Sequence, residues 1–107
     1  MKYYRWYYPS ALTQLAAVAH EAGHETAVYD AEICHERDPS TKDRAILMRN
    51  QSLYHNNVDN LDHPIWQHLK QVVTEQSPDV VVVSALTCKL KSVLNIFKIV
   101  RNIDSKI

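Results

Sequence analysis

The chain has 107 residues, enough for one domain with one modest hydrophobic core. Its 12 basic and 12 acidic side chains cancel, so the charge gives no electrostatic footprint for nucleic acid or for an anionic membrane. No apolar run approaches the roughly 20 residues of a membrane span, and the N-terminal MKYYRWYYPS lacks the apolar stretch of a secretory signal.

The single glycine and the two cysteines exclude several cofactor motifs. The dinucleotide-binding G-x-G-x-x-G motif and the phosphate-binding P-loop both need several glycines, whereas this chain has only Gly23. Cys34 and Cys88 lie far apart and form no C-x-x-C pair, so no zinc, iron–sulfur or disulfide framework is indicated. We expect reduced cysteines and a cytoplasmic protein.

The first half of the chain predicts a strand, a helix and a second strand. The aromatic run at residues 2–8 favours a strand, and Ser10 is a good N-cap for the helix that follows. Apolar residues recur at helical spacing over residues 12–22, and Gly23 is expected to end the helix as a left-handed C-cap. The alternating pattern at residues 24–30 then predicts a short strand that closes at Asp30.

The second half predicts an excursion, a helix, a buried strand and a last helix. Residues 35–60 are polar and read as a surface excursion with one short helix. Asp62 is expected to cap a helix that stops at Ser77-Pro78. The run DVVVVSAL at residues 79–86 is typical of a strand buried on both faces. A helix follows from about Lys89 to Asn102, and its expected inner side consists of Leu90, Val93, Leu94, Phe97 and Val100.

This alternation predicts an α/β fold. We expect a Rossmann-like or flavodoxin-like three-layer domain with a parallel sheet, built here from about three strands and three helices. Such sheets usually have five or more strands, so residues 1–107 are interpreted as a single domain that is incomplete at its C-terminus. Val80 to Val83 are expected at the centre of the sheet, where a Val82→Asp substitution costs several kcal/mol.

The pentapeptide HEAGH at residues 20–24 matches the H-E-x-x-H signature of zinc peptidases. In that signature two histidines on one helix bind the metal and the glutamate between them, here Glu21, is the general base. Gly23 is expected to end the helix before His24, so His24 cannot share a face with His20. We therefore predict that His24 lies outside any helix and that no metal bridges the two histidines, with a zinc peptidase kept as an alternative.

Two segments together resemble a known family. PSALTQLAAVAHEAGHETAVYD at residues 9–30 and SPDVVVVSALTCKLKSVLNIFKIVRNI at residues 77–103 look like the N-terminal cobalamin-binding domain of cobalamin-dependent radical S-adenosylmethionine enzymes. In that family a proline-containing loop leads to a helix ending in EAGHEV, and a PDVVGIS strand, a loop and an amphipathic helix come later. The resemblance implies a cobalamin-binding module of a methyltransferase or cyclase.

The resemblance also implies a site formed by two loops. Ser84-Ala85-Leu86 matches the S-x-L element that lies beside the lower face and nucleotide tail of cobalamin. Ligands of open α/β sheets bind at the carboxyl ends of strands, where both loops are expected. A compatible alternative is that Ser84 and Thr87 cap the last helix. The site residues implied in this way are Tyr8, Pro9, Ser10, Ser84, Ala85, Leu86 and Thr87.

Two departures from related motifs qualify the resemblance. The D-x-H-x-x-G motif, which supplies a histidine to cobalt in other cobalamin proteins, is absent, and the loop at residues 7–10 has no histidine. The implied cobalamin therefore has no protein histidine on its cobalt. The C-x-x-x-C-x-x-C motif is also absent, so the [4Fe–4S] cluster and S-adenosylmethionine are implied to belong to a radical S-adenosylmethionine catalytic domain C-terminal to this segment.

Two further interpretations stay open. The N-terminal Rossmann-like domain of a glycosyltransferase shares a helix ending in GHEV and a PD-V strand, but it usually begins with a glycine-containing loop that this chain lacks. The chain could also be a partial fold without activity. Neither nucleic acid nor a membrane is expected as a partner.

Overall fold

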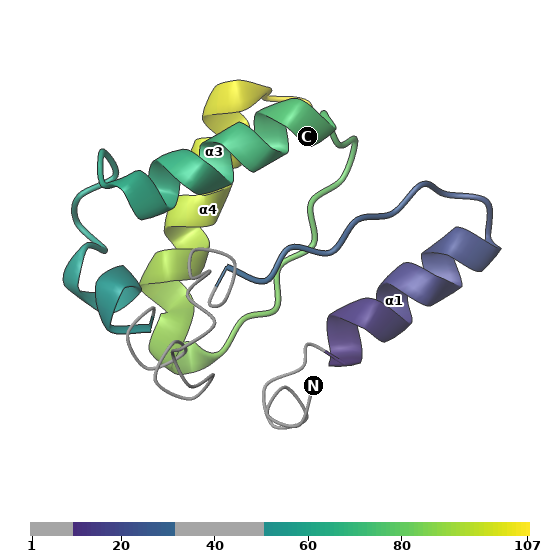
Figure 1. Ribbon diagram of the computed structural model, residues 1–107, viewed down its shortest axis with the longest axis horizontal. Coiled ribbons are helices and arrows are strands. Elements are labelled where there is room, and N and C mark those ends of the chain that lie inside the picture. The colour runs from purple at the N-terminus through teal and green to yellow at the C-terminus, as the bar shows by residue number, and fades with distance from the viewer. Residues whose placement is uncertain (1–9, 32–50) are drawn as a thin grey trace, which may run out of the picture. The chain divides into compact units, whose positions relative to one another are not determined.

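The computed structural model divides the chain into two compact units, residues 1–50 and 51–107 (Figure 1). It describes residues 10–31 and 51–107. Within those ranges no helix combines the length and the apolar character needed to cross a bilayer. The first unit contributes helix α1 (Ser10–Glu21), and the second contains a helical stretch at residues 51–56, helix α3 (Pro64–Gln76), the 3-10 helix η2 (Thr87–Lys89) and helix α4 (Leu90–Ile103).

Helix α1 ends where the sequence predicts. Gly23 has a positive φ of 94°, which a residue without Cβ adopts freely. The N–H of Gly23 donates to the carbonyl of His20 at 2.9 Å, and the N–H of His24 donates to that of Ala19 at 3.0 Å. This pair of bonds forms a Schellman motif and satisfies carbonyls of the last turn. The predictions that Gly23 ends the helix and that His24 lies outside it are confirmed.

Helix α3 begins at a different cap from the one predicted. The N-cap is His63, whose Nδ1 accepts the N–H of Ile65 at 3.3 Å. The prediction of Asp62 as the cap is wrong, because Asp62 lies one residue earlier, in the preceding turn. The other end lies at Ser77-Pro78 as predicted, with Ser77 in the left-handed region at φ 45°.

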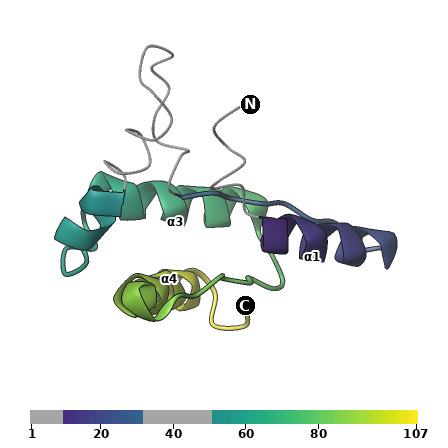
Figure 2. The same cartoon turned by 90° about the horizontal axis from the view of Figure 1, so that it is seen from below.

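The hydrophobic core of the second unit lies between α3 and α4, which cross at a steep angle (Figures 1 and 2). Trp66 is the most deeply buried side chain, with 1% of its surface exposed. Burying an aliphatic or aromatic side chain contributes roughly 1.5–3 kcal/mol. The other buried apolar side chains of this core are Ile65, Leu69 and Val73 of α3 and Val93, Ile99 and Val100 of α4.

Two side-chain N–H groups tie the loop before α3 to both helices. Trp66 Nε1 donates to the carbonyl of Asn57 at 2.9 Å, and Asn95 Nδ2 donates to the carbonyl of Val58 at 2.6 Å. The ring of Tyr54 packs edge-on against Trp66, with 5.1 Å between the ring centroids. Because Asn95 is 6% exposed, its amide depends on this partner within the protein.

The predicted three-layer α/β sheet is wrong, because no residue in the described ranges lies in a strand. The predicted strand at residues 2–8 lies outside the described residues, and residues 24–30 and 80–86 are not assigned to any strand. Among described residues, no backbone hydrogen bond involves residues 79–85. A strand buried on both faces needs a paired backbone at its edges and a covering layer on each face.

The valine run illustrates this correction. Val80 and Val82 are 74% and 64% exposed, whereas Val81 and Val83 are half-buried. An extended chain turns alternate side chains to opposite sides, so one side of the run is partly covered and the other faces solvent. The placement of Val80 to Val83 at the centre of a sheet is therefore wrong.

We expect Val82→Asp to change the free energy of unfolding by less than about 0.5 kcal/mol, as for an exposed site. Val100→Asp places the same carboxylate at a site that is 4% exposed and should cost several kcal/mol, because the charge is desolvated without a partner. Urea unfolding of both variants checks this. Severe destabilisation by Val82→Asp alone would contradict the exposed placement.

We expect Asn95→Ala to destabilise the protein by about 1–3 kcal/mol, because the carbonyl of Val58 loses its side-chain donor. Asn102→Ala on the same helix removes an exposed amide and serves as the matched control, with a change within about 0.5 kcal/mol. Equal unfolding midpoints for the two variants would show that the Asn95 bond carries no net stabilisation.

Candidate functional site

The loop at Ser84–Thr87 joins the extended segment to η2 and α4. Leu86 is still extended, with φ −104° and ψ 148°. The chain then turns, since the N–H of Lys89 donates to the carbonyl of Leu86 at 2.8 Å and the N–H of Leu90 donates to that of Thr87. A single 3-10 turn thus converts extended chain into helix and leaves the loop at the N-terminal end of α4.

All four side chains of this loop are exposed. Ser84 and Thr87 present hydroxyl groups that can donate and accept hydrogen bonds. Ala85 between them is small, so a broad ring can approach the backbone there, and Leu86, 61% exposed, adds apolar surface. The loop therefore presents hydroxyl groups and apolar side chains next to each other on the surface.

Helix capping does not account for Ser84 and Thr87. The N-cap of η2 is Leu86 and the N-cap of α4 is Lys89, and neither helix start has a side-chain cap hydrogen bond. The alternative that Ser84 and Thr87 only cap the last helix is therefore not what the structure shows. Both side chains are exposed.

We expect Ser84→Ala and Thr87→Ala to leave the unfolding free energy within about 0.5 kcal/mol of the parent, as for exposed residues without a structural role. The matched comparison is His63→Ala, which removes an observed cap and should cost roughly 1 kcal/mol. Thermal or urea unfolding monitored by circular dichroism measures all three. If Ser84→Ala or Thr87→Ala lowers the unfolding free energy as much as His63→Ala does, that residue caps the last helix after all.

The first predicted loop is described only in part. Tyr8 and Pro9 lie outside the described residues, and Ser10 is the exposed first residue of α1. Its carbonyl accepts the hydroxyl of Thr13 at 3.0 Å. Ser10 belongs to the first unit and Ser84–Thr87 to the second, so a joint site of the two loops stays a prediction of the sequence.

The HEAGH residues do not form the helical pair of a zinc peptidase. His20 lies in the last turn of α1, Glu21 is its final residue, and His24 follows the Gly23 cap. A zincin needs both histidines on one face of a continuous helix. The peptidase alternative loses its geometric basis, and the prediction that no metal bridges the two histidines remains a prediction.

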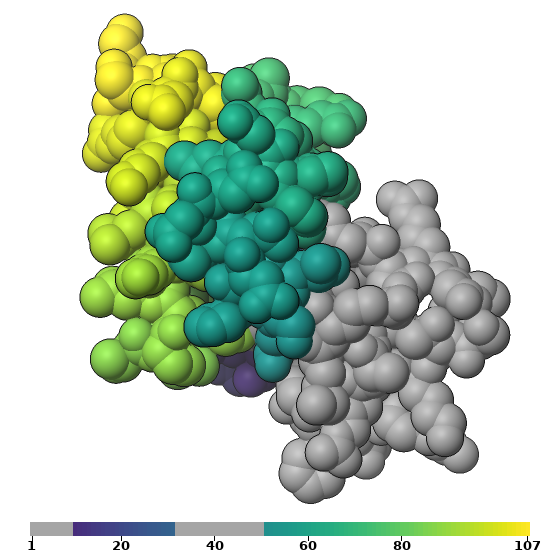
Figure 3. Space-filling view, turned by 90° about the vertical axis from the view of Figure 1, so that its left-hand side faces the viewer, coloured from purple at the N-terminus to yellow at the C-terminus, as the bar shows by residue number. Residues whose placement is uncertain are grey.

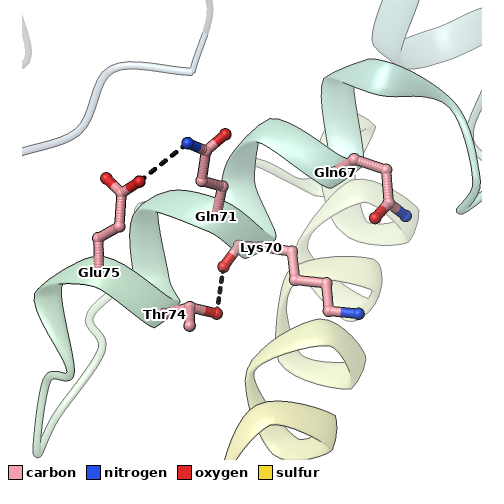
Figure 4. A pocket seen from close by; sticks show the side chains of 5 residues that line it. All are labelled: Gln67, Lys70, Gln71, Thr74 and Glu75. Carbon is pink, nitrogen blue, oxygen red and sulfur yellow. Dashed lines mark hydrogen bonds between the residues drawn. The ribbon is translucent and has the colours of Figure 1, made fainter.

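A shallow depression on the outer face of α3 carries polar side chains that bond within the helix (Figure 4). Gln71 Nε2 donates to Glu75 Oε1 at 2.8 Å, and Thr74 Oγ1 donates to the carbonyl of Lys70 at 2.7 Å. Figure 4 shows Gln71 and Glu75 pointing toward each other, whereas the amine of Lys70 points away from them. These groups do not converge on a common point, so the depression offers no built site.

A groove on α4 was not anticipated from the sequence. It is a shallow, open depression, here called the α4 groove, that is lined by Leu61, Leu94, Phe97, Lys98, Arg101 and Asn102. The predicted inner side of this helix is divided, because Val93 and Val100 are buried whereas Leu90, Leu94 and Phe97 are exposed. Ile96, Ile99 and Ile103 widen the apolar stripe of this helix beyond the five residues of the predicted inner side. That extra width was the sequence signal for a second, exposed apolar face.

Comparison of the chain with protein-family models, with curated proteins and with solved structures finds no match.

Proposed function

We propose that this chain is a cobalamin-binding module of a radical S-adenosylmethionine enzyme of the methyltransferase or cyclase type. The observation that carries the proposal is the loop Ser84–Thr87, which matches the S-x-L element and whose side chains are exposed and take no part in helix capping. Bound cobalamin supplies a cobalt centre that can accept and donate a methyl group. We also propose that the protein is cytoplasmic.

Each residue of the Ser84–Thr87 loop has a different role in this proposed binding mode. Ala85 leaves space for the corrin ring, and Leu86 packs against its apolar surface. The hydroxyls of Ser84 and Thr87 hydrogen-bond to polar groups at the edge or tail of the cofactor. The resemblance implies Tyr8, Pro9 and Ser10 as further contacts of the cofactor. No histidine lies in either loop, so this mode of binding has no protein histidine on the cobalt.

The catalytic partner in this proposal is a radical S-adenosylmethionine domain that supplies the [4Fe–4S] cluster and the S-adenosylmethionine. The glycosyltransferase alternative is less well supported, because Gly23, the one glycine of the chain, serves as a helix cap and not in a nucleotide-binding loop.

We expect the full chain to bind methylcobalamin, measured by absorbance after gel filtration and by equilibrium titration. Ala85→Trp fills the space for the ring and should weaken binding about tenfold or more. Ala17→Trp, at an exposed position of α1, is the matched control and should bind as the parent does. Absence of binding, or equal binding by both variants, would overturn the assignment of this loop.

A footprint and a spectrum locate the bound cofactor. Cys88 is an exposed free thiol directly after Thr87, so methylcobalamin should slow its alkylation, as read by peptide mass mapping.

The electron paramagnetic resonance spectrum of the bound cob(II)alamin form should contain no nitrogen splitting that depends on a protein histidine. Splitting that disappears when one of the six histidines is mutated would exclude the proposed histidine-free mode.

A further inference from the structure

The outward side of α4 carries an apolar ridge. Leu90, Leu94 and Phe97 are 54%, 48% and 46% exposed, and their spacings of four and three residues place them in one row along the helix. Val93 and Val100 are buried on the inward side. In Figure 3 the surface of α4, green to yellow, runs beside the teal surface of the segment before α3. A narrow row of this kind is the seam through which one helix packs on another.

The charged side chains of α4 are all basic. Lys91 and Lys98 are exposed, and Arg101 continues the row beyond Phe97. The helix contains no aspartate or glutamate. Arg101 donates a hydrogen bond to the carbonyl of Ser105, which anchors the guanidinium at the end of the α4 groove. The apolar ridge thus lies beside basic side chains, and no acidic side chain lies within Leu90–Ile103.

We infer that the ridge and the α4 groove form a docking site for a protein partner, an amphipathic helix whose apolar seam is flanked by aspartate or glutamate. Leu90 to Arg101 span about 17 Å at the helical rise, which matches about three turns of a partner helix. Apolar side chains of the partner pack on Leu94 and Phe97, while its carboxylates face Lys98 and Arg101. The inference does not depend on cobalamin binding.

The charges and the width of the ridge favour this occupant over two others. A second copy of the chain would bring Lys98 and Arg101 against like charges, which disfavours a symmetric α4 pair. A helix that lies in a membrane surface buries a broad apolar face. Here the inward side of α4 is packed in the core, so only a row one side chain wide is available.

The test is a nitrogen-15 NMR titration of the full chain with two synthetic helical peptides of identical leucine seam, one flanked by glutamates and one by lysines. The glutamate peptide should shift resonances of α4 and of Leu61. Phe97→Ala should weaken its binding about tenfold. Lys98→Glu with Arg101→Glu should reverse the preference, so that the lysine peptide binds the double variant more tightly.

Lys70→Glu on α3 is the matched charge control and should leave both affinities within about twofold, as expected for an exposed charge outside the docking site. Circular dichroism confirms that each variant is folded. Equal affinity for the two peptides, shifts confined to other elements, or absence of binding would overturn the inference. Tighter binding to phosphatidylserine vesicles than to the glutamate peptide, abolished by Phe97→Ala, would overturn it in favour of a membrane surface.

Discussion

Two hydrogen bonds from separate helices to consecutive carbonyls organise the second unit. The indole N–H of Trp66 in α3 donates to the carbonyl of Asn57, and the amide of Asn95 in α4 donates to the carbonyl of Val58. One short loop is therefore bonded to both helices and fixes them relative to each other. Neither donor can be satisfied by bulk water, because both side chains are buried. Apolar burial drives the two helices together, and these bonds select the one arrangement in which no buried amide or indole N–H is left without a partner.

Exposure on α4 follows from this arrangement. Asn95 is turned inward at one edge of the buried side of α4, and Val93 and Val100 lie at its other edge. The row containing Leu90, Leu94 and Phe97 is turned outward. A helix with apolar residues around most of its circumference has several possible inward faces. The buried asparagine removes that ambiguity, since only one rotation of α4 brings its amide to the carbonyl of Val58.

The two proposed binding surfaces occupy different parts of the same α4 element. The Ser84–Thr87 loop precedes the N-terminal start of α4, whereas the proposed docking surface runs from Leu90 along the helix to the α4 groove in its C-terminal half. The loop offers hydroxyls and a small residue, which suit a polar-edged ring. The groove offers an apolar row with basic neighbours, which suits a helix with an acidic flank. The two proposed surfaces therefore share no side chain.

The sequence by itself determined where α1 and α3 end and most of the extent of the last helix. Gly23 and Ser77-Pro78 stop helices through local backbone chemistry, which needs no distant partner. The helix after Thr87 also follows from periodicity alone. The resemblance singled out Ser84–Thr87, and the structure describes that loop as exposed.

Only the tertiary structure decided which apolar residues are buried and which are exposed. A run of valines has the same local preference whether it is paired or not, and pairing depends on residues far away in the chain, so Val80 and Val82 lie exposed instead of in a sheet. Whether Asp62 or His63 caps α3 depended on the path of the preceding loop. The inward face of α4 depended on Asn95 meeting a carbonyl 37 residues earlier, a contact that helical spacing does not encode.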